Sequence, residues 1–266
     1  DLGRDLAIKV LLDCHKDKPR VVQRFIEEAQ IAGQLQHPGI APVYELGQAA
    51  DKRPFFSMKL IKGKTLATLL SQRKNPREEL GKFLGIFEQI CQTLAYAHSR
   101  GVIHRDLKPA NIMVGAFGEV QVMDWGLAKV LVAKDDRGDG AANTQSVDQS
   151  VIATRRSGID VEGEVTAVDS NLNAQTLMGT VLGTPSYMPP EQALGENDNL
   201  SERADVFGLG AILAEVLTGD PPYVGTSGTE ILRLAARGKV GPCFDRLDAS
   251  EADAEIVELA KSCLAP

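Results

Sequence analysis

The chain has 266 residues, of which 43% are hydrophobic and 24% are charged, and its formal net charge at pH 7 is -7. This composition excludes a disordered chain and predicts a globular protein with a sizeable core, in one large domain or two smaller ones. The acidic balance argues against nucleic acid as a partner, because a nucleic-acid surface needs clustered Lys and Arg to replace phosphate counterions.

The cysteines and histidines lack the spacing of a disulfide framework or a metal site. None of the four cysteines forms a CxxC pair, and no histidine has a second His or Cys at metal-ligand spacing. We therefore expect reduced thiols in a cytoplasmic domain and no transition metal. The longest apolar run, residues 206–214, is too short to span a membrane, so no membrane contact is expected within this segment. The start at Asp1 rather than Met suggests an excerpt from a longer protein.

The first part of the chain is predicted to form a small α+β unit. Residues 6–12 are an apolar run broken by Lys9, which is typical of a strand that projects one ammonium group. Residues 20–35 place apolar side chains at spacings of three and four, which predicts one helix. Residues 40–47 and 54–61 are predicted as strands of a small sheet.

The second part is predicted to be mainly helical. Residues 80–98 keep a 3.6-residue apolar period, and residues 205–217 are apolar nearly all round, which is typical of a helix buried among other helices. Residues 229–237 and 252–264 supply two further amphipathic helices. Between about residues 130 and 182 the pattern disappears, so this stretch is predicted to be a mobile, largely disordered insert that carries acceptor hydroxyls.

The stretch VIHRDLKPANIMV, residues 102–114, places charged and polar groups between two apolar runs. The apolar runs are predicted to be buried strands, with a further apolar strand at residues 120–123. Buried charges need partners or a ligand. These polar side chains are therefore candidates for a functional site.

Six motifs then follow one another in the order found in protein kinases. They are Ala7-Ile8-Lys9, Glu27-Glu28, residues 104–111, Asp124-Trp125-Gly126, residues 183–191 and residues 205–208. In these motifs the chain resembles the eukaryotic-like serine/threonine protein kinases. The sequences HPGIAPVYELG, residues 37–47, and SYMPPEQA, residues 186–193, resemble the bacterial branch of that family. The resemblance implies an α+β, two-lobed fold with an incomplete N-lobe in residues 1–62 and a mainly helical C-lobe in residues 63–266.

The resemblance implies ATP and Mg²⁺ as cofactors, with Mn²⁺ as an alternative to Mg²⁺. Lys9 would bind the ATP phosphates while a helical acid fixes its flexible stem, with Glu28 as the candidate and Glu27 as the runner-up. Asn111 and Asp124 would hold the metal through the oxygen ligands that Mg²⁺ prefers.

The resemblance also implies the groups that act on the protein substrate. Asp106 would accept or orient the hydroxyl of a serine or threonine in a protein substrate, and Lys108 would steady the transferred phosphoryl group. Thr184 would bridge these two residues.

Adenine recognition is expected to use the backbone and apolar side chains. By resemblance Met58 is the gatekeeper, Lys59 and Ile61 offer a carbonyl and an amide to the base, and Ala7 and Met113 enclose the ring. A Met or Ala on an apolar strand is also an ordinary core residue.

Control by phosphorylation is implied by Arg105, which precedes Asp106 and could pair with a phosphate. Thr176 and Thr180 are the candidate acceptors, although loop hydroxyls are common and a turn-forming role would leave the same residues. A dimer for trans-autophosphorylation is possible. Structural support is expected from His104, Gly126, Glu191 and Asp205.

The chain also departs from the family pattern. Trp125 stands where Phe is usual, Pro189-Pro190-Glu191 replaces Ala-Pro-Glu, and Lys59 and Lys62 stand where acids are common. The first two strands with their glycine-rich loop and the last helix are expected to be missing from this segment. The favoured hypothesis is that the parent protein is an active kinase, of which this segment alone transfers phosphate only feebly. The alternative is that the segment is a catalytically weak nucleotide-binding or scaffolding pseudokinase.

Overall fold

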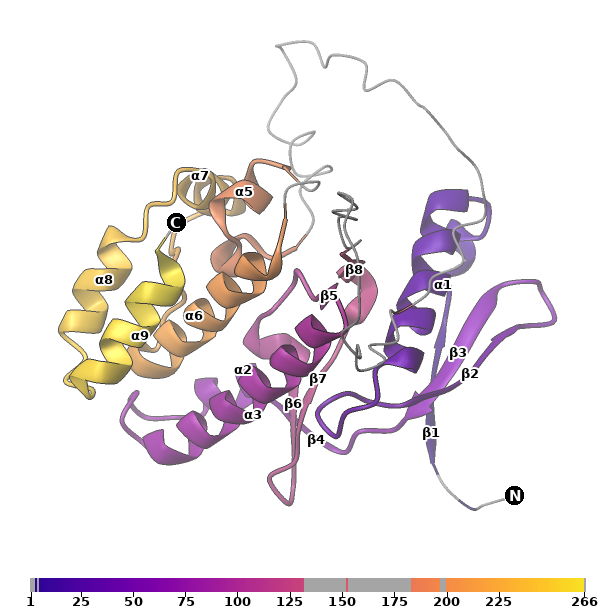
Figure 1. Ribbon diagram of the computed structural model, residues 1–266, viewed down its shortest axis with the longest axis horizontal. Helices are drawn as coiled ribbons and strands as arrows, with labels where there is room; N and C mark the ends of the chain where they lie inside the picture. The colour runs from indigo at the N-terminus through magenta and orange to yellow at the C-terminus, as the bar shows by residue number, and fades with distance from the viewer. Residues whose placement is uncertain (1–2, 4, 132–151, 153–182, 197–199, 266) are drawn as a thin grey trace, which may run out of the picture.

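The computed structural model describes residues 3, 5–131, 152, 183–196 and 200–265 (Figure 1). The described part forms two lobes, as the sequence predicted. One lobe, here the N-lobe, consists of β1 (Leu6–Val10), α1 (Pro19–Gln34), β2 (Val43–Gln48) and β3 (Pro54–Lys59). The other, the C-lobe, holds the remaining elements and most of the helices.

The N-lobe is an antiparallel sheet in the order β1-β3-β2 with α1 packed against it. Strand β1 lies beside β3, and this register places Lys9 opposite Phe56. Pro19 begins α1, because its fixed φ suits the first helical turn and its missing N–H is not needed there. Phe25 and Ala29 of α1 pack on Phe56, so one face of the helix closes the apolar side of the sheet.

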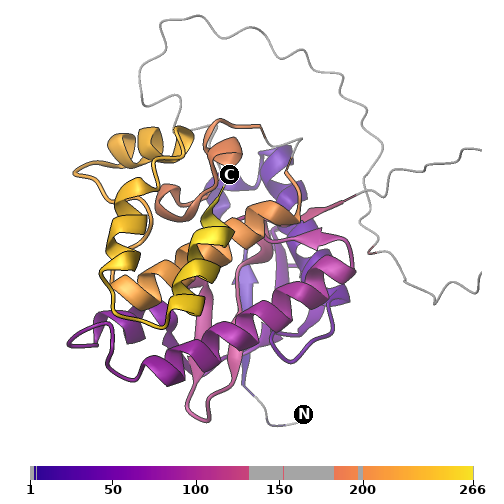
Figure 2. The same ribbon diagram turned by 60° about the vertical axis from the view of Figure 1, so that its left-hand side comes forward.

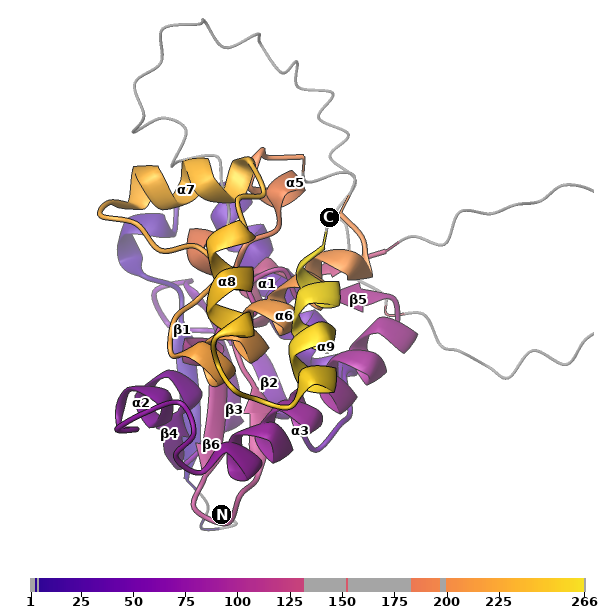
Figure 3. The same cartoon turned by 90° about the vertical axis from the view of Figure 1, so that its left-hand side faces the viewer.

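The C-lobe is built around two long helices that lie side by side (Figures 1 and 2), α3 (Leu80–Ser99) and α6 (Glu202–Thr218). Helix α6 is buried on nearly every side, since α8 (Gly241–Asp248) and α9 (Ala254–Leu264) also pack against it (Figure 3). The other α-helices among the described residues of this lobe are α2 (Leu66–Ser71), α5 (Pro190–Ala193) and α7 (Gly228–Ala236). No helix among the described residues is long and apolar enough to cross a bilayer.

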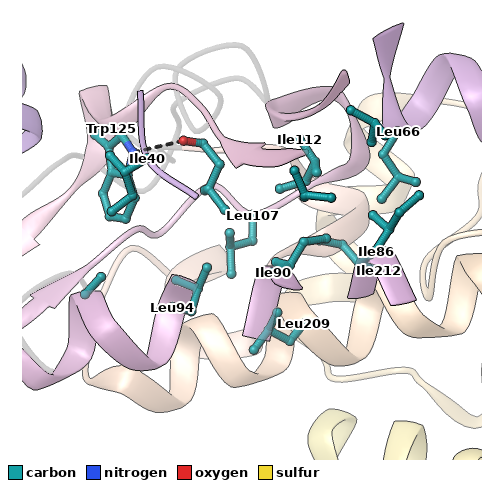
Figure 4. Close-up of a cluster of buried hydrophobic side chains, with 14 of the residues drawn as sticks. Ile40, Leu66, Ile86, Ile90, Leu94, Leu107, Ile112, Trp125, Leu209 and Ile212 are labelled. Carbon is teal, nitrogen blue, oxygen red and sulfur yellow. Dashed lines mark hydrogen bonds between the residues drawn. The ribbon is translucent and has the colours of Figure 1, made fainter. Parts of the chain in front are cut away.

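The polar stretch at residues 102–114 contains two short strands of the C-lobe, each of which pairs with other short strands. Strands β4 (Gly63–Thr65), β6 (Ile112–Gly115) and β7 (Val120–Val122) form one antiparallel sheet, and β5 (Val102–Ile103) pairs with β8 (Lys129–Val130). Figure 4 shows how apolar side chains anchor this region, with Leu107 and Ile112 lying among residues of α3 and α6. The apolar runs around the polar stretch are therefore core, as their composition indicated.

The lobes are also joined by the segment after α1. Val122 N of β7 donates a hydrogen bond to Gly39 O at 2.8 Å, and Ile40 forms a parallel bridge with Val122. The predicted strand at residues 40–47 is therefore wrong at its start, since the N-lobe strand begins at Val43 and Ile40 pairs with the C-lobe instead.

Other predicted boundaries shift by a few residues. Strand β1 ends at Val10 rather than at residue 12, and α6 begins at Glu202 rather than at residue 205. The short elements α2, α5, α8 and β4 were not predicted. Most of the expected insert at residues 130–182 lies outside the described residues, and the lobe boundary at residue 62 stays a prediction.

Candidate active site

Three remote segments bring a lysine and two acids together between the lobes. Lys9 Nζ of β1 lies 2.6 Å from Glu28 Oε1 of α1 and 3.6 Å from Asp124 Oδ1, which follows β7. Burial raises the pKa of Glu28, an effect that the neighbouring Lys9 charge opposes and Asp124 reinforces. Glu27, the runner-up for this contact, instead accepts a hydrogen bond from Gln23 Nε2 at 3.0 Å.

Asp124 is held in an unusual backbone conformation. Its φ is +61°, a left-handed value that costs energy for a residue other than glycine and is often found at functional sites. The next residue, Trp125, is buried and donates Nε1–H to Val122 O at 3.2 Å, which fixes the turn. At Gly126 an added Cβ would lie 3.1 Å from Glu28 Oε2 and 3.2 Å from Asp124 Oδ1, so glycine leaves room for both carboxylates.

A second cluster surrounds the carboxylate of Asp106. Its Oδ2 accepts hydrogen bonds from Lys108 Nζ at 2.7 Å and Asn111 Nδ2 at 3.0 Å. Its Oδ1 accepts from the backbone N–H of Thr184 at 3.1 Å and from the Thr184 hydroxyl at 3.3 Å. Lys108 Nζ also donates to Thr184 Oγ1 at 2.6 Å. Hydrogen bonds therefore fix the positions of both the Asp106 carboxylate and the Lys108 ammonium group.

The backbone before Asp106 is anchored by the buried carboxylate of Asp205 on α6. Its Oδ2 accepts from His104 N at 2.7 Å and from His98 Nε2 at 2.8 Å, and its Oδ1 accepts from Arg105 N at 2.8 Å. Three donors satisfy a carboxylate that is 1% exposed and that would otherwise be costly to bury. Arg105 has a φ of +68°, so the anchor holds a strained residue.

His104 joins the two clusters. Its Nδ1 accepts from Asp106 N at 3.2 Å, so Nε2 carries the proton and donates to Met123 O at 3.0 Å. The ring is fully buried and packs edge-on against Trp125, with the ring centres 4.8 Å apart. Both nitrogens are thus used inside the protein. Met123 N in turn donates to Asn111 O at 2.7 Å, which fixes Asp124 beside Asn111.

The residues present suit an oxygen-preferring cation. The Asn111 amide nitrogen faces Asp106, which turns its carbonyl oxygen to the opposite side. The Asp124 side chain is 52% exposed, so its carboxylate is accessible. Amide and carboxylate oxygens are ligands that Mg²⁺ and Mn²⁺ accept.

The proposed adenine contacts are only partly brought together. Ala7 and Met58 are paired in register between β1 and β3, and Met58 lines a pocket with Glu28, Phe56 and Asp124. Met113 lies on the other sheet, on β6 opposite Gln121. Lys59 is exposed and Ile61 is half-buried. That Ala7 and Met113 enclose one ring stays a prediction.

Of the candidate regulatory residues, the structure describes Arg105. Arg105 Nε donates to Leu127 O at 2.5 Å, and burial, followed by the positive charge of Arg24, lowers the pKa of its guanidinium. Two cations thus face the same region. Thr176 and Thr180 lie outside the described residues. Glu191, expected as structural support, is half-buried in α5.

Two further residues at the site were not predicted. Gln192 is 3% exposed and donates Nε2–H to Arg105 O at 2.7 Å, and His98 donates to Asp205 as described above. Gln192 stands in a four-residue helix, too short for a periodic pattern. Its position directly after Glu191 in a predicted motif was the available signal.

Comparison with known proteins agrees with this geometry. Residues 1–154 and 166–266 match the family model described as the protein kinase domain. The chain is 36% identical over 254 residues to the serine/threonine-protein kinase PknD of Chlamydia pneumoniae, covering 90% of this chain and 24% of that protein. It is 34% identical over 277 residues to PknD of Chlamydia trachomatis serovar D, covering 99% and 27% respectively. The chain therefore spans about a quarter of the length of these curated relatives.

Proposed function

This chain belongs to the protein kinase domain family, and we propose that it is a serine/threonine protein kinase, which transfers the γ-phosphate of ATP to hydroxyl groups of protein substrates. The observation that supports this proposal is the position of Lys9 Nζ, 2.6 Å from Glu28 and 3.6 Å from Asp124. Residues far apart in the chain thus meet in one place, beside the Asp106 cluster. A pseudokinase would have no chemical need to keep Lys9, Asp106, Asn111 and Asp124 together.

Lys9 binds and orients the phosphates of ATP in this proposal. Phosphoryl transfer needs charge neutralisation and alignment more than covalent help from the protein. At about 4 Å and an effective dielectric near 20, one lysine–phosphate charge pair contributes roughly 4 kcal/mol. The ion pair with Glu28 restricts the lysine side chain, so that its charge is already in place when ATP binds.

Asn111 and Asp124 would hold Mg²⁺ or Mn²⁺. The bound cation would neutralise the phosphate oxygens. The strained turn at Asp124 and the hydrogen bond from Met123 to Asn111 hold the two side chains in place before the cation arrives.

Asp106 orients the acceptor hydroxyl and takes its proton. Its Oδ1 already accepts a hydrogen bond from a hydroxyl, that of Thr184, which is the contact that a substrate serine or threonine would make. Lys108, at 2.7 Å from Asp106 Oδ2, adds positive charge where the phosphoryl group passes.

Phosphorylation at Thr176 or Thr180 would regulate the site. A phosphate brought to Arg105 and Arg24 would relieve the repulsion between two cations, one of them half-buried. One copy phosphorylating another in a transient dimer would supply that phosphate, and the cytoplasm would supply ATP and protein substrates.

The test is a phosphotransfer assay with radiolabelled ATP, Mg²⁺ and a generic protein substrate rich in serine and threonine. The wild-type chain should label serine and threonine, even if only at a low rate. Asp106→Asn and Lys9→Met should each lower kcat/KM by at least about 100-fold. Glu28→Gln should also lose activity, whereas Glu27→Gln, its neighbour on the same helix, should not. Binding of MgATP without any transfer would instead identify a pseudokinase.

A further inference from the structure

We propose that Gln192 is a positioning residue for phosphoryl transfer, which holds the carbonyl of Arg105 and thereby fixes the direction of Asp106. This inference rests on the proposed kinase function. Gln192 donates its hydrogen bond to the backbone carbonyl of Arg105, so its effect would pass through the backbone between Arg105 and Asp106.

The contact is short, and the Gln192 side chain that makes it is buried. Gln192 Nε2 lies 2.7 Å from Arg105 O, and the side chain is 3% exposed. The orientation of the amide follows from chemistry, because its oxygen would be repelled by the carbonyl that it faces. Loss of this donor would leave the Arg105 carbonyl without its hydrogen-bond partner in the protein, at a cost in free energy.

Arg105 is the residue that most needs such support. Its φ of +68° is unfavourable for a side chain of this size, and its N–H is already bound to Asp205 Oδ1 at 2.8 Å. Asp205 therefore holds one side of the residue and Gln192 holds the other. The two contacts come from different helices, α6 and α5, so neither alone defines the conformation.

The peptide group that Gln192 binds is also the one that leads into Asp106. Its oxygen belongs to Arg105 and its nitrogen to Asp106, and that N–H donates to His104 Nδ1 at 3.2 Å. A rotation of this peptide plane would break the His104 contact and turn the Asp106 carboxylate away from Lys108. The amide of Gln192 prevents that rotation.

Close packing at Gly183 ties the same amide to the substrate side of the site. A Cβ at Gly183 would lie 3.0 Å from Gln192 Nε2 and 3.4 Å from Arg105 O, and the φ of this glycine is +115°. The next residue, Thr184, donates its N–H to Asp106 Oδ1 at 3.1 Å. The three residues Gln192, Gly183 and Arg105 are thus closely packed against one another. A shift in any of them would displace Asp106.

The test compares Gln192→Met with Gln121→Met. Methionine keeps the length and shape of glutamine but removes the donor. Gln121 is a matched control on β7, because it is 4% exposed and its Nε2 also donates to a backbone carbonyl, Pro38 O, at 3.3 Å. Gln192→Met should lower kcat by roughly 10- to 100-fold, as for a displaced catalytic group, with KM for ATP within about twofold of wild type. Gln121→Met should leave both constants unchanged.

A second variant adds a pH readout that lost packing alone would not produce. Gln192→Glu places a carboxylate against the Arg105 carbonyl, and a carboxyl group gains an O–H donor when it is protonated. The ratio of its kcat to that of wild type should therefore rise as the pH falls. A flat ratio, or Gln192→Met with the kcat of Gln121→Met, would overturn the proposal.

Hydrogen exchange separates this inference from the proposed function. In Gln192→Met the amides of residues 102–107 should exchange faster than in wild type, and in Gln121→Met they should not. If the wild-type chain transfers no phosphate, the kinase proposal fails, but the exchange rates still decide the role of Gln192. Equal exchange in Gln192→Met and wild type would show that the amide does not hold this segment.

Discussion

At the scale of residues, the site depends on backbone strain that specific contacts maintain. Arg105 and Asp124 both have positive φ, which costs about 1–3 kcal/mol for each residue. Asp205 and Gln192 hold the first, and the turn around Trp125 holds the second. Side chains with fixed backbones lose little further freedom when a ligand binds, which favours rapid chemistry.

The ion pair of Glu28 with Lys9 should make activity fall on the acid side of neutrality. Burial raises the pKa of Glu28 above its ordinary value of 4.5, so protonation begins at a higher pH than for an exposed glutamate. The protonated form cannot pair with Lys9. We expect the kcat/KM of wild type to decline as the pH falls toward this pKa, whereas Glu28→Gln should be low at every pH. If kcat/KM of Glu28→Gln still declined at low pH as that of wild type does, the decline would be due to another group.

The raised pKa of Glu28 also makes the free energy of unfolding depend on pH, but in the opposite direction to activity. The folded protein binds the Glu28 proton more tightly than the unfolded chain, so this group stabilises the fold most below pH 4.5. That stabilisation is lost as the pH rises through the folded pKa of Glu28, by about 1.4 kcal/mol for each pKa unit of the shift. Urea unfolding of wild type and Glu28→Gln across this range should show a wild-type advantage that shrinks with rising pH.

At the scale of elements, α6 is the scaffold of the site. Its first turn carries Asp205, and near its other end Glu215 Oε2 accepts a hydrogen bond from Tyr187 OH at 2.7 Å. Arg73 donates to Val216 O at 2.9 Å and so satisfies a carbonyl near the end of the helix. One helix thus fixes both the segment before Asp106 and the segment after Thr184.

Replacing Gly208 on α6 should push this scaffold away from the site. A methyl group there would lie 2.9 Å from Leu107 Cβ, and Leu107 directly follows Asp106. Gly208→Ala should therefore lower the free energy of unfolding by about 1–3 kcal/mol and reduce kcat. Gly85→Ala on α3 is the matched control, since nothing lies within 4 Å of its added Cβ. That control should gain up to about 1 kcal/mol from helix propensity. Equal stability of the two variants would contradict this account.

The sequence predicted the long elements well because each buries one apolar face. Helices α1 and α3 keep that pattern, whereas α6 was recognised because it is apolar nearly all round. It starts three residues before the predicted start because its first turn is polar and begins at the cap Ser201. Helix α2 has six residues, too few for a period to be recognised. Ile40 is as apolar as a strand residue, and only the tertiary structure shows that it pairs with Val122. The motifs predicted the residues that meet around Lys9 and Asp106, whereas the contact of Gln192 with Arg105 is visible only in the structure.

At the scale of the whole molecule, the proposed ligand joins the two lobes. Lys9 belongs to the N-lobe, whereas Asn111 and Asp124 belong to the C-lobe, so MgATP would contact both at once. Without this ligand, the lobes are tied near the end of α1, where Val122 N donates to Gly39 O, and by the ion pair of Lys9 with Asp124. Binding should therefore stabilise the chain as a unit.

Thermal unfolding with and without MgATP checks this expectation. At a ligand concentration about 100 times Kd, the folded state should gain about 2.7 kcal/mol, with a corresponding rise in Tm. Lys9→Met and Asp124→Asn should lose most of this gain. Lys82→Met is the control, because Lys82 pairs with Glu79 at 3.0 Å on the surface of α3. An equal rise in all variants would place the nucleotide elsewhere.

The hydroxyl of Thr184, 3.3 Å from Asp106 Oδ1, carries the same functional group as the proposed acceptor. An incoming serine or threonine must compete with a side chain that it closely resembles. Until a substrate hydroxyl displaces it, the Thr184 hydroxyl would occupy the place on Asp106 that a water molecule could otherwise take. Water at that place could attack ATP and hydrolyse it. The arrangement would restrain wasteful turnover in a resting enzyme, and Thr184→Val should release a larger share of ATP as free phosphate.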